Sequence, residues 1–518
     1  MWCLHQVPQG ARAADDSVPV VPEGIGTAAW LWLSRLPPEM HHKVVEMLRS
    51  AKRRLGKPSF GSAFSGTELT LKLLRMLDDL LDQEHCLKFD WQHSFCAEKN
   101  PAKRAFIRSQ HDAPVVFCDA ADLAKMYAMN EVTGEDVVVP FCTAMAAGFS
   151  CKSRSRQNNN RAKFKHCISK DTDCETTATF KMLLAYVRVM LPLLLWVENV
   201  GDLMQADEFD VSDYDYVLKA FTDLGYFTQG FAMEATTHGS IAKRSRLYIV
   251  AVLLVPGMER FHEQLSAFSS TFLKSSEIGA GNPGEFLNLS KDSCVTSERP
   301  QKTQRVDFKY LEEHNEFFRA IDVKWPPSLV AYPHVCTTGM FERHVEVAIF
   351  LDCCYPRDPT IEGPEFIDAN HSLGRIMGRS AHDCTKEDFK KSVWTSQVPT
   401  ITSMSSILMR WIPPDAKPDV MLRLLTGVEL MSVIGWSQVM WAPNTSAEML
   451  ADNSTLTSLA GNAFSGYSIG PMLLLGIMLT GASPDMFQPV LAARTAVSDG
   501  EDNSGDSTTS PEFTSPEF

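Results

Sequence analysis

The chain has 518 residues, of which 44% are hydrophobic and 22% charged, and its formal net charge at pH 7 is −14. This is the composition of a globular protein with more than one core, and the charge argues against a protein that is coated in basic residues. The 13 cysteines include no CxxC pair and are odd in number. We therefore expect a reducing compartment, with no disulfide framework and no metal site.

Secretory and membrane signals are not expected in this sequence. The N-terminus has no basic patch followed by an apolar run, and the longest apolar stretch, 182–197, is interrupted by Arg188 and Pro192 and too short to span a bilayer. Residues 1–55 look like an N-terminal extension with a helix over 28–54. At the other end, we expect residues 486–518 to form a disordered tail, because the chain from Val497 onward is rich in Ser, Asp, Glu and Thr.

The middle of the chain predicts the α/β fold class. Over residues 56–255, short apolar runs alternate with amphipathic segments, which is typical of a doubly wound parallel sheet flanked by helices. The expected strands are 62–64, 95–97, 115–118, 136–139, 194–198, 227–234 and 246–252. Residues 256–398 are less regular and indicate an inserted second domain, and helical periodicity returns within 399–485, over 420–434 and 467–479.

A glycine turn follows the first predicted strand. The sequence Phe64-Ser65-Gly66-Thr67-Glu68 precedes a predicted helix over 69–81. A glycine here lets backbone amides approach a ligand closely, and a helix N-terminus favours a carboxylate. Taken alone, such a glycine is usually only a turn.

Three acids follow the next two predicted strands. Glu98 is placed to accept hydrogen bonds from ribose hydroxyls, and Asp119, or alternatively Asp122, is placed to bind the amino group of an adenine. Each acid alone is more often a helix cap. Together, along one edge of a doubly wound sheet, they favour a ligand that contains adenosine.

Cys151 stands beside a run of cationic residues that contains no acid. We expect this field to lower the pKa of the thiol and to bind phosphates. The alternatives are a basic surface loop with an incidental cysteine, or a cysteine hydrolase with His166 as its base, for which no orienting partner is evident. The cationic residues are Lys152, Arg154, Arg156, Arg161, Lys163 and Lys165.

An acid and an amide, Glu198 and Asn199, end the apolar run 194–197. A cysteine that attacks a pyrimidine ring needs an acid to protonate the ring nitrogen, and Glu198 supplies one. Arg244 and Arg246 precede the last predicted strand, where guanidinium groups can pair with Glu198 or with a substrate carbonyl.

In their order along the chain, these segments resemble the motifs of the cytosine-C5 DNA methyltransferase family. The match covers roughly residues 60 to 480 and also includes Pro399-Thr400-Ile401-Thr402, Arg423-Leu424-Leu425-Thr426 and Gly461-Asn462-Ala463. The sequence departs from the family pattern at Ser150, where proline is usual, at Lys152 and Ala242, where glutamine is usual, and at Thr67-Glu68, where a glycine pair is common.

The resemblance implies a Rossmann-like class I methyltransferase domain over 56–255 and 399–485, with 256–398 as the target-recognition region. It implies that Cys151 adds to ring carbon six of a flipped-out cytosine, that Glu198 protonates the ring nitrogen, and that Asn199 holds the cysteine loop. Arg244 and Arg246 would steady Glu198 and the carbonyl of the base. The methyl donor would be S-adenosylmethionine, bound by Phe64, Ser65, Gly66, Thr67, Glu68, Glu98, Lys99, Asp119, Asp122 and Asn462.

The function that follows is DNA (cytosine-5-)-methyltransferase. The alternatives are a tRNA cytosine-C5 methyltransferase, which shares the fold and the cysteine mechanism, and a non-catalytic relative that binds nucleic acid or a partner. We expect DNA as the partner, with RNA second, and a nuclear location if the cell has a nucleus and a cytoplasmic one otherwise. The sequence leaves the oligomeric state open.

Overall fold

The computed structural model describes residues 24–64, 66–155, 158, 160–206, 211–289, 357, 363–368, 394–412 and 421–486. Ser65 and Arg156 lie outside the described residues, as do most of the predicted target-recognition region and residues 487–518 of the predicted tail.

A seven-stranded sheet forms the centre of the molecule, in the order β3-β2-β1-β6-β7-β9-β8. β9 runs antiparallel to both of its neighbours, and the other neighbouring strands are parallel. The chain starts with β1 in the middle, continues outward to β3 and then returns to β6 on the other side of β1, so the predicted doubly wound α/β sheet is confirmed. The strands are β1 (Ser59–Ala63), β2 (Gln92–Ala97), β3 (Val116–Phe117), β6 (Ala144–Ala147), β7 (Leu194–Asn199), β8 (Tyr226–Glu234) and β9 (Ser245–Leu253).

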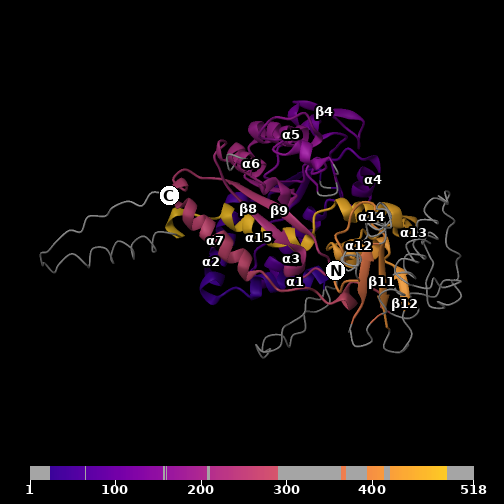
Figure 1. Cartoon of the computed structure of the whole chain (residues 1–518). Helices are drawn as coiled ribbons and strands as arrows, with labels where there is room; N and C mark the ends of the chain where they lie inside the picture. The colour runs from indigo at the N-terminus through magenta and orange to yellow at the C-terminus, as the bar shows by residue number, and fades with distance from the viewer. Residues whose placement is uncertain are drawn as a thin grey trace, which may run out of the picture.

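Helices cover both faces of this sheet (Figure 1). One face packs against α1 (Gly24–Ser34), α2 (Pro38–Leu55), α3 (Leu69–His85), α7 (His262–Ser275) and α15 (Gly466–Thr480), and the other against α5 (Glu175–Met190) and α6 (Asp213–Thr222). Alternate residues of β7 serve the two cores: Trp196 belongs to the first and Val197 to the second. This period of two is the geometry of a strand that is buried on both faces.

The central helix of the first face is α15, whose fifteen residues are all buried. It confirms the predicted helix over 467–479, and its Met472 carbonyl accepts a hydrogen bond of 2.9 Å from Nε1 of Trp196. Among the described residues no single helix is long and apolar enough to cross a membrane, and only the bent pair α14 (Asn453–Asn462) and α15 passes that test together. Because α15 is enclosed by the sheet and by α1, α2, α3 and α7, its apolar composition is that of a core helix.

Two predicted elements differ from the structure. The strand predicted over 136–139 exists as β5 (Glu135–Val138), but it pairs with β4 (Tyr127–Asn130) in a separate hairpin. The strand that lies beside β1 in the sheet is β6 (Ala144–Ala147), and no strand was predicted for this Ala-Met-Ala-Ala segment. The helix predicted over 420–434 is in fact the strand β12 (Met421–Leu424) followed by α12 (Gly427–Val433).

A second, three-stranded antiparallel sheet is built from β10 (Glu365–Asp368), β11 (Ile407–Trp411) and β12. Figure 1 shows it at one end of the molecule beside α12, α13 (Ala447–Ala451) and α14 (Asn453–Asn462), with α4 (Pro101–Gln110) nearby. The predicted boundaries at 55, 256 and 398 stay predictions. The described elements continue across them, since α1, α2 and α7 share the core of α15 and the small sheet has strands on both sides of residue 398.

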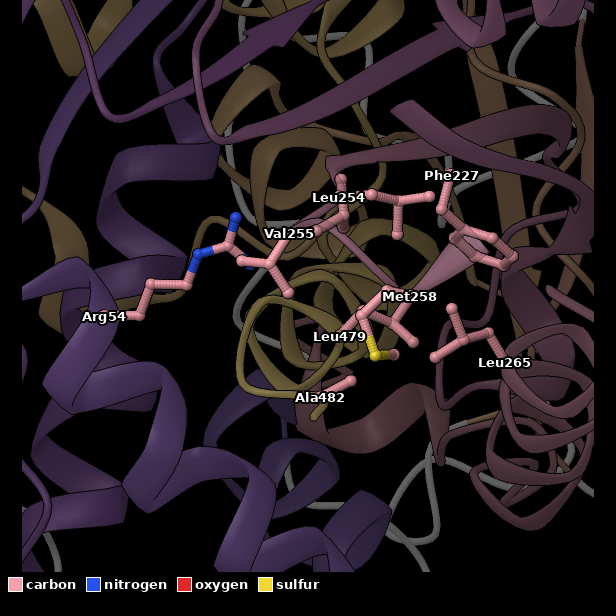
Figure 2. A pocket seen from close by; sticks show the side chains of 9 residues that line it. Arg54, Phe227, Leu254, Val255, Met258, Leu265, Leu479 and Ala482 are labelled. Carbon is pink, nitrogen blue, oxygen red and sulfur yellow. The ribbon is translucent and has the colours of Figure 1, made fainter. Parts of the chain in front are cut away.

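A small apolar cavity lies between β8, β9, α7 and α15 (Figure 2). At one end the Arg54 guanidinium donates to the Leu253 and Thr480 carbonyls, at 2.6 and 3.0 Å. Val252 of this cavity pairs with Leu194, the first residue of β7, whereas Glu198 lies near the strand's other end. The cavity is therefore at the edge of the sheet opposite the predicted catalytic residues, and its apolar lining indicates a packing defect.

Candidate functional site

The cysteine loop and the predicted acid leave neighbouring strands at the same edge of the sheet. β6 and β7 are parallel, with Ala147 paired to Val197, so Gly148 and Glu198 follow the last pair side by side. The carboxyl ends of parallel strands beside a switch in chain order are where α/β sheets bind ligands. The structure thus brings together the two segments that the sequence separates by 47 residues, Cys151 and Glu198.

Asn199 connects these two segments. Its Nδ2 donates a hydrogen bond of 2.8 Å to the Phe149 carbonyl, and its Oδ1 accepts one of 2.8 Å from the Val200 amide. Asn199 is 1% exposed. This is the contact that the predicted loop-holding role requires.

Gly148 allows the loop to pass very close to other parts of the site. A Cβ at this position would lie 2.8 Å from Cε1 of Phe464 and 3.4 Å from Oε2 of Glu198. Phe464 is buried, and any side chain at 148 would have to displace its ring.

Ser150 takes part in two hydrogen bonds that shape the loop around Cys151. Its amide donates to Oγ1 of Thr179 on α5 at 3.0 Å, and its own hydroxyl accepts from the Lys152 amide at 3.4 Å. A proline at this position has no amide hydrogen to donate. The departure from the family pattern therefore replaces ring rigidity with hydrogen bonds to α5 and within the loop.

The pKa of Cys151 differs from the sequence-based prediction. Burial raises the pKa of the thiol, the nearby Glu198 carboxylate raises it further, and Arg246 and Arg244 oppose these effects. The prediction that the neighbouring cationic run lowers it is wrong, because the strongest charges acting on Cys151 come from β7 and β9.

Arg246 is the partner of the predicted acid. Its Nε lies 3.0 Å from Oε1 of Glu198, and the two side chains are 17% and 14% exposed. A guanidinium held against the carboxylate fixes its orientation toward the space beside Cys151.

Arg244 is buried beside the site, and its hydrogen bonds go to the backbone. Its guanidinium donates to three backbone carbonyls: Ile401 at 3.1 Å, Gly461 at 3.3 and 3.4 Å, and Ala463 at 2.6 Å. Burial lowers its pKa to about 10. Arg244 therefore joins β9 to the Pro-Thr-x-Thr and Gly-Asn-Ala segments, and among its hydrogen bonds in the described structure none reaches Glu198.

The cationic run after Cys151 divides into exposed and buried members. Arg161, Lys163 and Lys165 are exposed on or beside a 3₁₀ turn (Arg161–Phe164), and Lys152 forms an ion pair of 2.9 Å with Glu175. Arg154 is only 2% exposed, so the prediction that it contacts phosphate is wrong.

Arg154 acts inside the protein instead. It donates to the carbonyls of Asp202 and Phe164, and its Nε lies 3.8 Å from Oδ2 of Asp213. These contacts hold the base of the loop against the segments that follow β7 and begin α6.

The predicted cofactor turn has a strained backbone. Phe64, Gly66 and Glu68 have φ values of 59°, 72° and 59°, in the left-handed region. Such conformations cost non-glycine residues about 1 kcal/mol or more and are concentrated at ligand sites. The Phe64 amide donates to the Ala97 carbonyl at 2.9 Å, which fixes the turn against the end of β2.

The prediction that Thr67 and Glu68 contact the cofactor is wrong. Both are fully buried, and the Glu68 carboxylate accepts a hydrogen bond from Ser62 and lies 3.9 Å from Nε2 of His93. The Thr67 carbonyl lies 3.1 Å from Nε2 of His111. These two residues therefore stabilise the turn from beneath.

The predicted acids lie at the ends of neighbouring strands. Glu98 follows β2, and its Oε1 accepts from the Asn100 amide at 2.9 Å. Asp119 follows β3, and its Oδ1 accepts from the Ala121 amide at 3.0 Å, while Oδ2 lies 3.8 Å from Nζ of Lys99. Asp122 pairs with Lys125 at 2.6 Å.

The chain fits an adenosine-containing cofactor at this edge. Glu98 and Asp119 each use one carboxylate oxygen for a local backbone hydrogen bond, and the second oxygen of Asp119 lies 3.8 Å from the exposed Lys99 ammonium, a weak pair that hydroxyl or amino groups of a ligand would replace. A Cβ on Gly66 would lie 3.5 Å from the Asn462 carbonyl, so this glycine keeps the turn and the end of α14 close together. The Asn462 side chain itself donates to the Ser458 carbonyl at 2.7 Å.

Sequence reasoning missed two residues of the site, Phe464 and Lys103. Phe464 closes the site over Gly148 from a segment 316 positions away in the chain, which no local pattern reveals. Nζ of Lys103 lies 3.9 Å from the Cβ position of Gly66. The Asn100-Pro101 pair, which the prediction did not use, is typical of a helix start and would have placed Lys103 in the first turn of a helix after Glu98.

The strand order, the antiparallel β9 and the ligand edge define a Rossmann-like class I methyltransferase fold. No protein-family model matches the chain. DNA (cytosine-5-)-methyltransferase DMT5 of Cryptococcus neoformans is 28% identical over 222 residues, which are 42% of this chain and 8% of that protein. The chain is thus related to a cytosine-5 DNA methyltransferase, as the motifs predicted, and the match spans a small part of that relative's length.

Solved structures with similar folds include the Dnmt2 methyltransferase of S. pombe and the methyltransferase EhMeth of Entamoeba histolytica. Each aligns with 84% of this chain and 99% of its own, with identities of 13% and 11% and TM-scores of 0.39 and 0.38. Because these scores are low, the fold assignment rests on the sheet itself.

Proposed function

We propose that the chain is a DNA (cytosine-5-)-methyltransferase that uses S-adenosylmethionine and forms a covalent adduct between Cys151 and the target cytosine. The observation that carries the proposal is the arrangement of residues at the catalytic edge, the edge of the sheet where β6 and β7 end side by side. There the Cys151 loop is tied to Asn199 at 2.8 Å, and Glu198 is paired with Arg246 at 3.0 Å.

Each residue has a defined task in this reaction. Cys151 attacks ring carbon six, Glu198 delivers a proton to the ring nitrogen, and Arg246 holds the acid in place. S-adenosylmethionine supplies an electrophilic methyl group when it is bound. A second base must then remove the proton from carbon five, so that elimination can release Cys151.

The raised pKa of Cys151 fits a reaction in which binding of the base triggers attack. Glu198 is one cause of the raised pKa. When the base binds and a proton is taken up from solvent between the Glu198 carboxylate and the ring nitrogen, the negative charge of Glu198 is neutralised and the Cys151 thiolate becomes easier to form. Attack is therefore favoured only after a pyrimidine has entered the site.

DNA is the proposed substrate because the related protein is named a DNA methyltransferase and because exposed cations follow Cys151. Arg161, Lys163 and Lys165 are placed to contact phosphates, and a base inside a duplex must be flipped out to reach a thiol. A DNA substrate places the protein in the nucleus of a eukaryotic cell, or in the cytoplasm of a cell without one, and fluorescence imaging of the tagged chain tests this location.

Covalent trapping tests the proposed activity. The full chain is incubated with S-adenosylmethionine and with DNA or RNA oligonucleotides that carry 5-fluorocytosine, which blocks the final elimination. We expect a denaturation-resistant adduct on DNA that is absent in Cys151→Ala. Cys142→Ala is the matched control, because Cys142 is a buried cysteine that precedes β6, whereas the Cys151 loop follows the other end of that strand.

The other outcomes point to the alternatives. An adduct on RNA alone supports the RNA methyltransferase. Retained binding without an adduct on either nucleic acid overturns both enzyme functions and supports a non-catalytic relative.

A further inference from the structure

A half-buried lysine, Lys103, faces the predicted cofactor turn and was not part of any motif. It lies in the first turn of α4, where Asn100 caps the helix by accepting hydrogen bonds from the Ala102 and Lys103 amides. This start places α4 directly after Glu98 and turns Lys103 back toward the end of the sheet. Its Nζ lies 3.9 Å from the Cβ position of Gly66.

The same point of the turn is 3.5 Å from the Asn462 carbonyl. An ammonium group, a left-handed glycine and the end of α14 therefore meet beside the N-terminus of α3. Unlike these backbone groups, Lys103 brings a full positive charge to the turn.

The charge of Lys103 has no anion directly bonded to it in the described part of the chain. Burial lowers its pKa, Glu98 acts in the opposite direction, and Lys152 lowers it further. Glu98 thus influences the ammonium from a distance, while one of its own oxygens is used by the Asn100 amide. A partly buried cation in this state is stabilised by any anionic ligand group that enters beside it.

We propose that Lys103 binds the amino-acid carboxylate of the cofactor; this inference rests on the proposed use of S-adenosylmethionine. That carboxylate is the only anionic group of the molecule. The adenosine part is uncharged, and the sulfonium and ammonium groups would be repelled by Lys103. The helix N-terminus at α3 favours the same carboxylate, so the turn and Lys103 act on it together.

Ligands that differ in the carboxylate test this assignment. S-adenosylhomocysteine keeps the whole amino acid, whereas 5′-deoxy-5′-methylthioadenosine has the adenosine and the sulfur without it. Isothermal titration of the full chain with each ligand measures affinity without any catalytic turnover. Lys103→Met removes the charge, and Lys103→Arg keeps it.

We expect Lys103→Met to weaken S-adenosylhomocysteine binding roughly tenfold or more, because a charged hydrogen bond is lost. Methylthioadenosine binding should change less than about twofold, and Lys103→Arg should restore most of the affinity for the larger ligand. Lys274→Met is the control: Lys274 lies on α7, is 78% exposed and pairs with Glu277, and its loss should leave both affinities nearly unchanged.

Equal weakening of both ligands, or none, would overturn the assignment, because Lys103 would then act on the adenosine part or on the fold. Methylthioadenosine binding also reports whether the variant is folded. If the unmodified chain binds neither ligand, the proposed cofactor itself is wrong. That result differs from a failure of Lys103 alone, in which the unmodified chain binds both ligands.

Discussion

Arg244 lies just before β9 and Arg246 lies within it, and the structure predicts different effects for the loss of each. Arg244 is 4% exposed and donates to the carbonyls of Ile401, Gly461 and Ala463. Arg244→Met keeps most of the side-chain volume but leaves these three carbonyls without their donor. Each buried carbonyl that loses its partner costs roughly 1–3 kcal/mol.

Part of this cost is offset by the removal of a buried charge. The pKa of Arg244 is lowered to about 10 by burial, which corresponds to about 3 kcal/mol against the charged form. Taking about 6 kcal/mol for the three carbonyls, we expect Arg244→Met to lower the free energy of unfolding by about 3 kcal/mol.

Arg246→Met should instead leave stability within about 1 kcal/mol, because the Arg246–Glu198 pair is partly exposed and such pairs contribute little. Its effect should fall on chemistry. Without the guanidinium, Glu198 loses the partner that orients it, and we expect adduct formation to slow roughly tenfold or more.

Urea denaturation measures the first effect and trapping on 5-fluorocytosine DNA, normalised to folded protein, measures the second. Lys243→Met is the control, because Lys243 is exposed and only its backbone forms hydrogen bonds in the described structure. Wild-type stability of Arg244→Met would refute the account of its three carbonyls. Destabilisation of Arg246→Met by as much as Arg244→Met would refute the division between them.

Four further predictions concern the catalytic edge. Asn199→Asp replaces the donor to the Phe149 carbonyl by a carboxylate, so unfolding should become easier by about 2 kcal/mol and adduct formation should fall; an unchanged trapping rate speaks against the loop-holding role. Adduct formation by the unmodified chain should accelerate from about pH 7 to about pH 9, because the raised pKa of Cys151 keeps the thiolate scarce until the pH is high; a plateau below about pH 8 is incompatible with this. Glu198→Gln removes one cause of that raised pKa, so iodoacetamide should alkylate Cys151 faster at a fixed pH, while the cytosine adduct is lost. Slower alkylation would contradict the role of Glu198 in raising the pKa. Lys163→Glu should weaken DNA binding most at low salt, as titrations at two ionic strengths would reveal, and equal affinity would exclude Lys163 from the interface.

β7 could be predicted from the sequence because the residues of the strand themselves show that it is buried. Residues 194–198 were expected as a strand and form most of β7 (Leu194–Asn199). A strand buried on both faces is a continuous apolar run, and the acid and amide after it mark where the run meets the ligand edge.

β6 escaped prediction for a physical reason. Ala144–Ala147 contains no β-branched or aromatic residue, and alanine is depleted in strands. It forms a strand because β1 and β7 lie on both sides of it and satisfy its backbone. The nearby hairpin strand at 135–138 contains valines and has the stronger local strand pattern, so a strand was predicted there and not at 144–147.

The two errors about charge share a cause in tertiary structure. Arg154 was grouped with its exposed neighbours, but it meets Asp202 and Asp213, which stand about fifty residues later. The pKa of Cys151 was judged from the residues next to it, whereas burial raises it most and Glu198 and Arg246 act on it from other strands. Charge in a folded site is set by neighbours in space, which a run of residues does not reveal.

Ser150 is the clearest departure from the family pattern, and its hydrogen bonds make it compatible with activity. The function of a proline before the cysteine is to restrict the loop, and restriction can be supplied by hydrogen bonds as well as by a ring. Here the Ser150 amide is tied to Thr179, and the Phe149 carbonyl is tied to Asn199, so the residues before Cys151 are held from two directions. A loop held in this way keeps Cys151 buried and beside Glu198. Burial and Glu198 together raise its pKa, and the proposed attack requires the thiol and the acid to act on the same base.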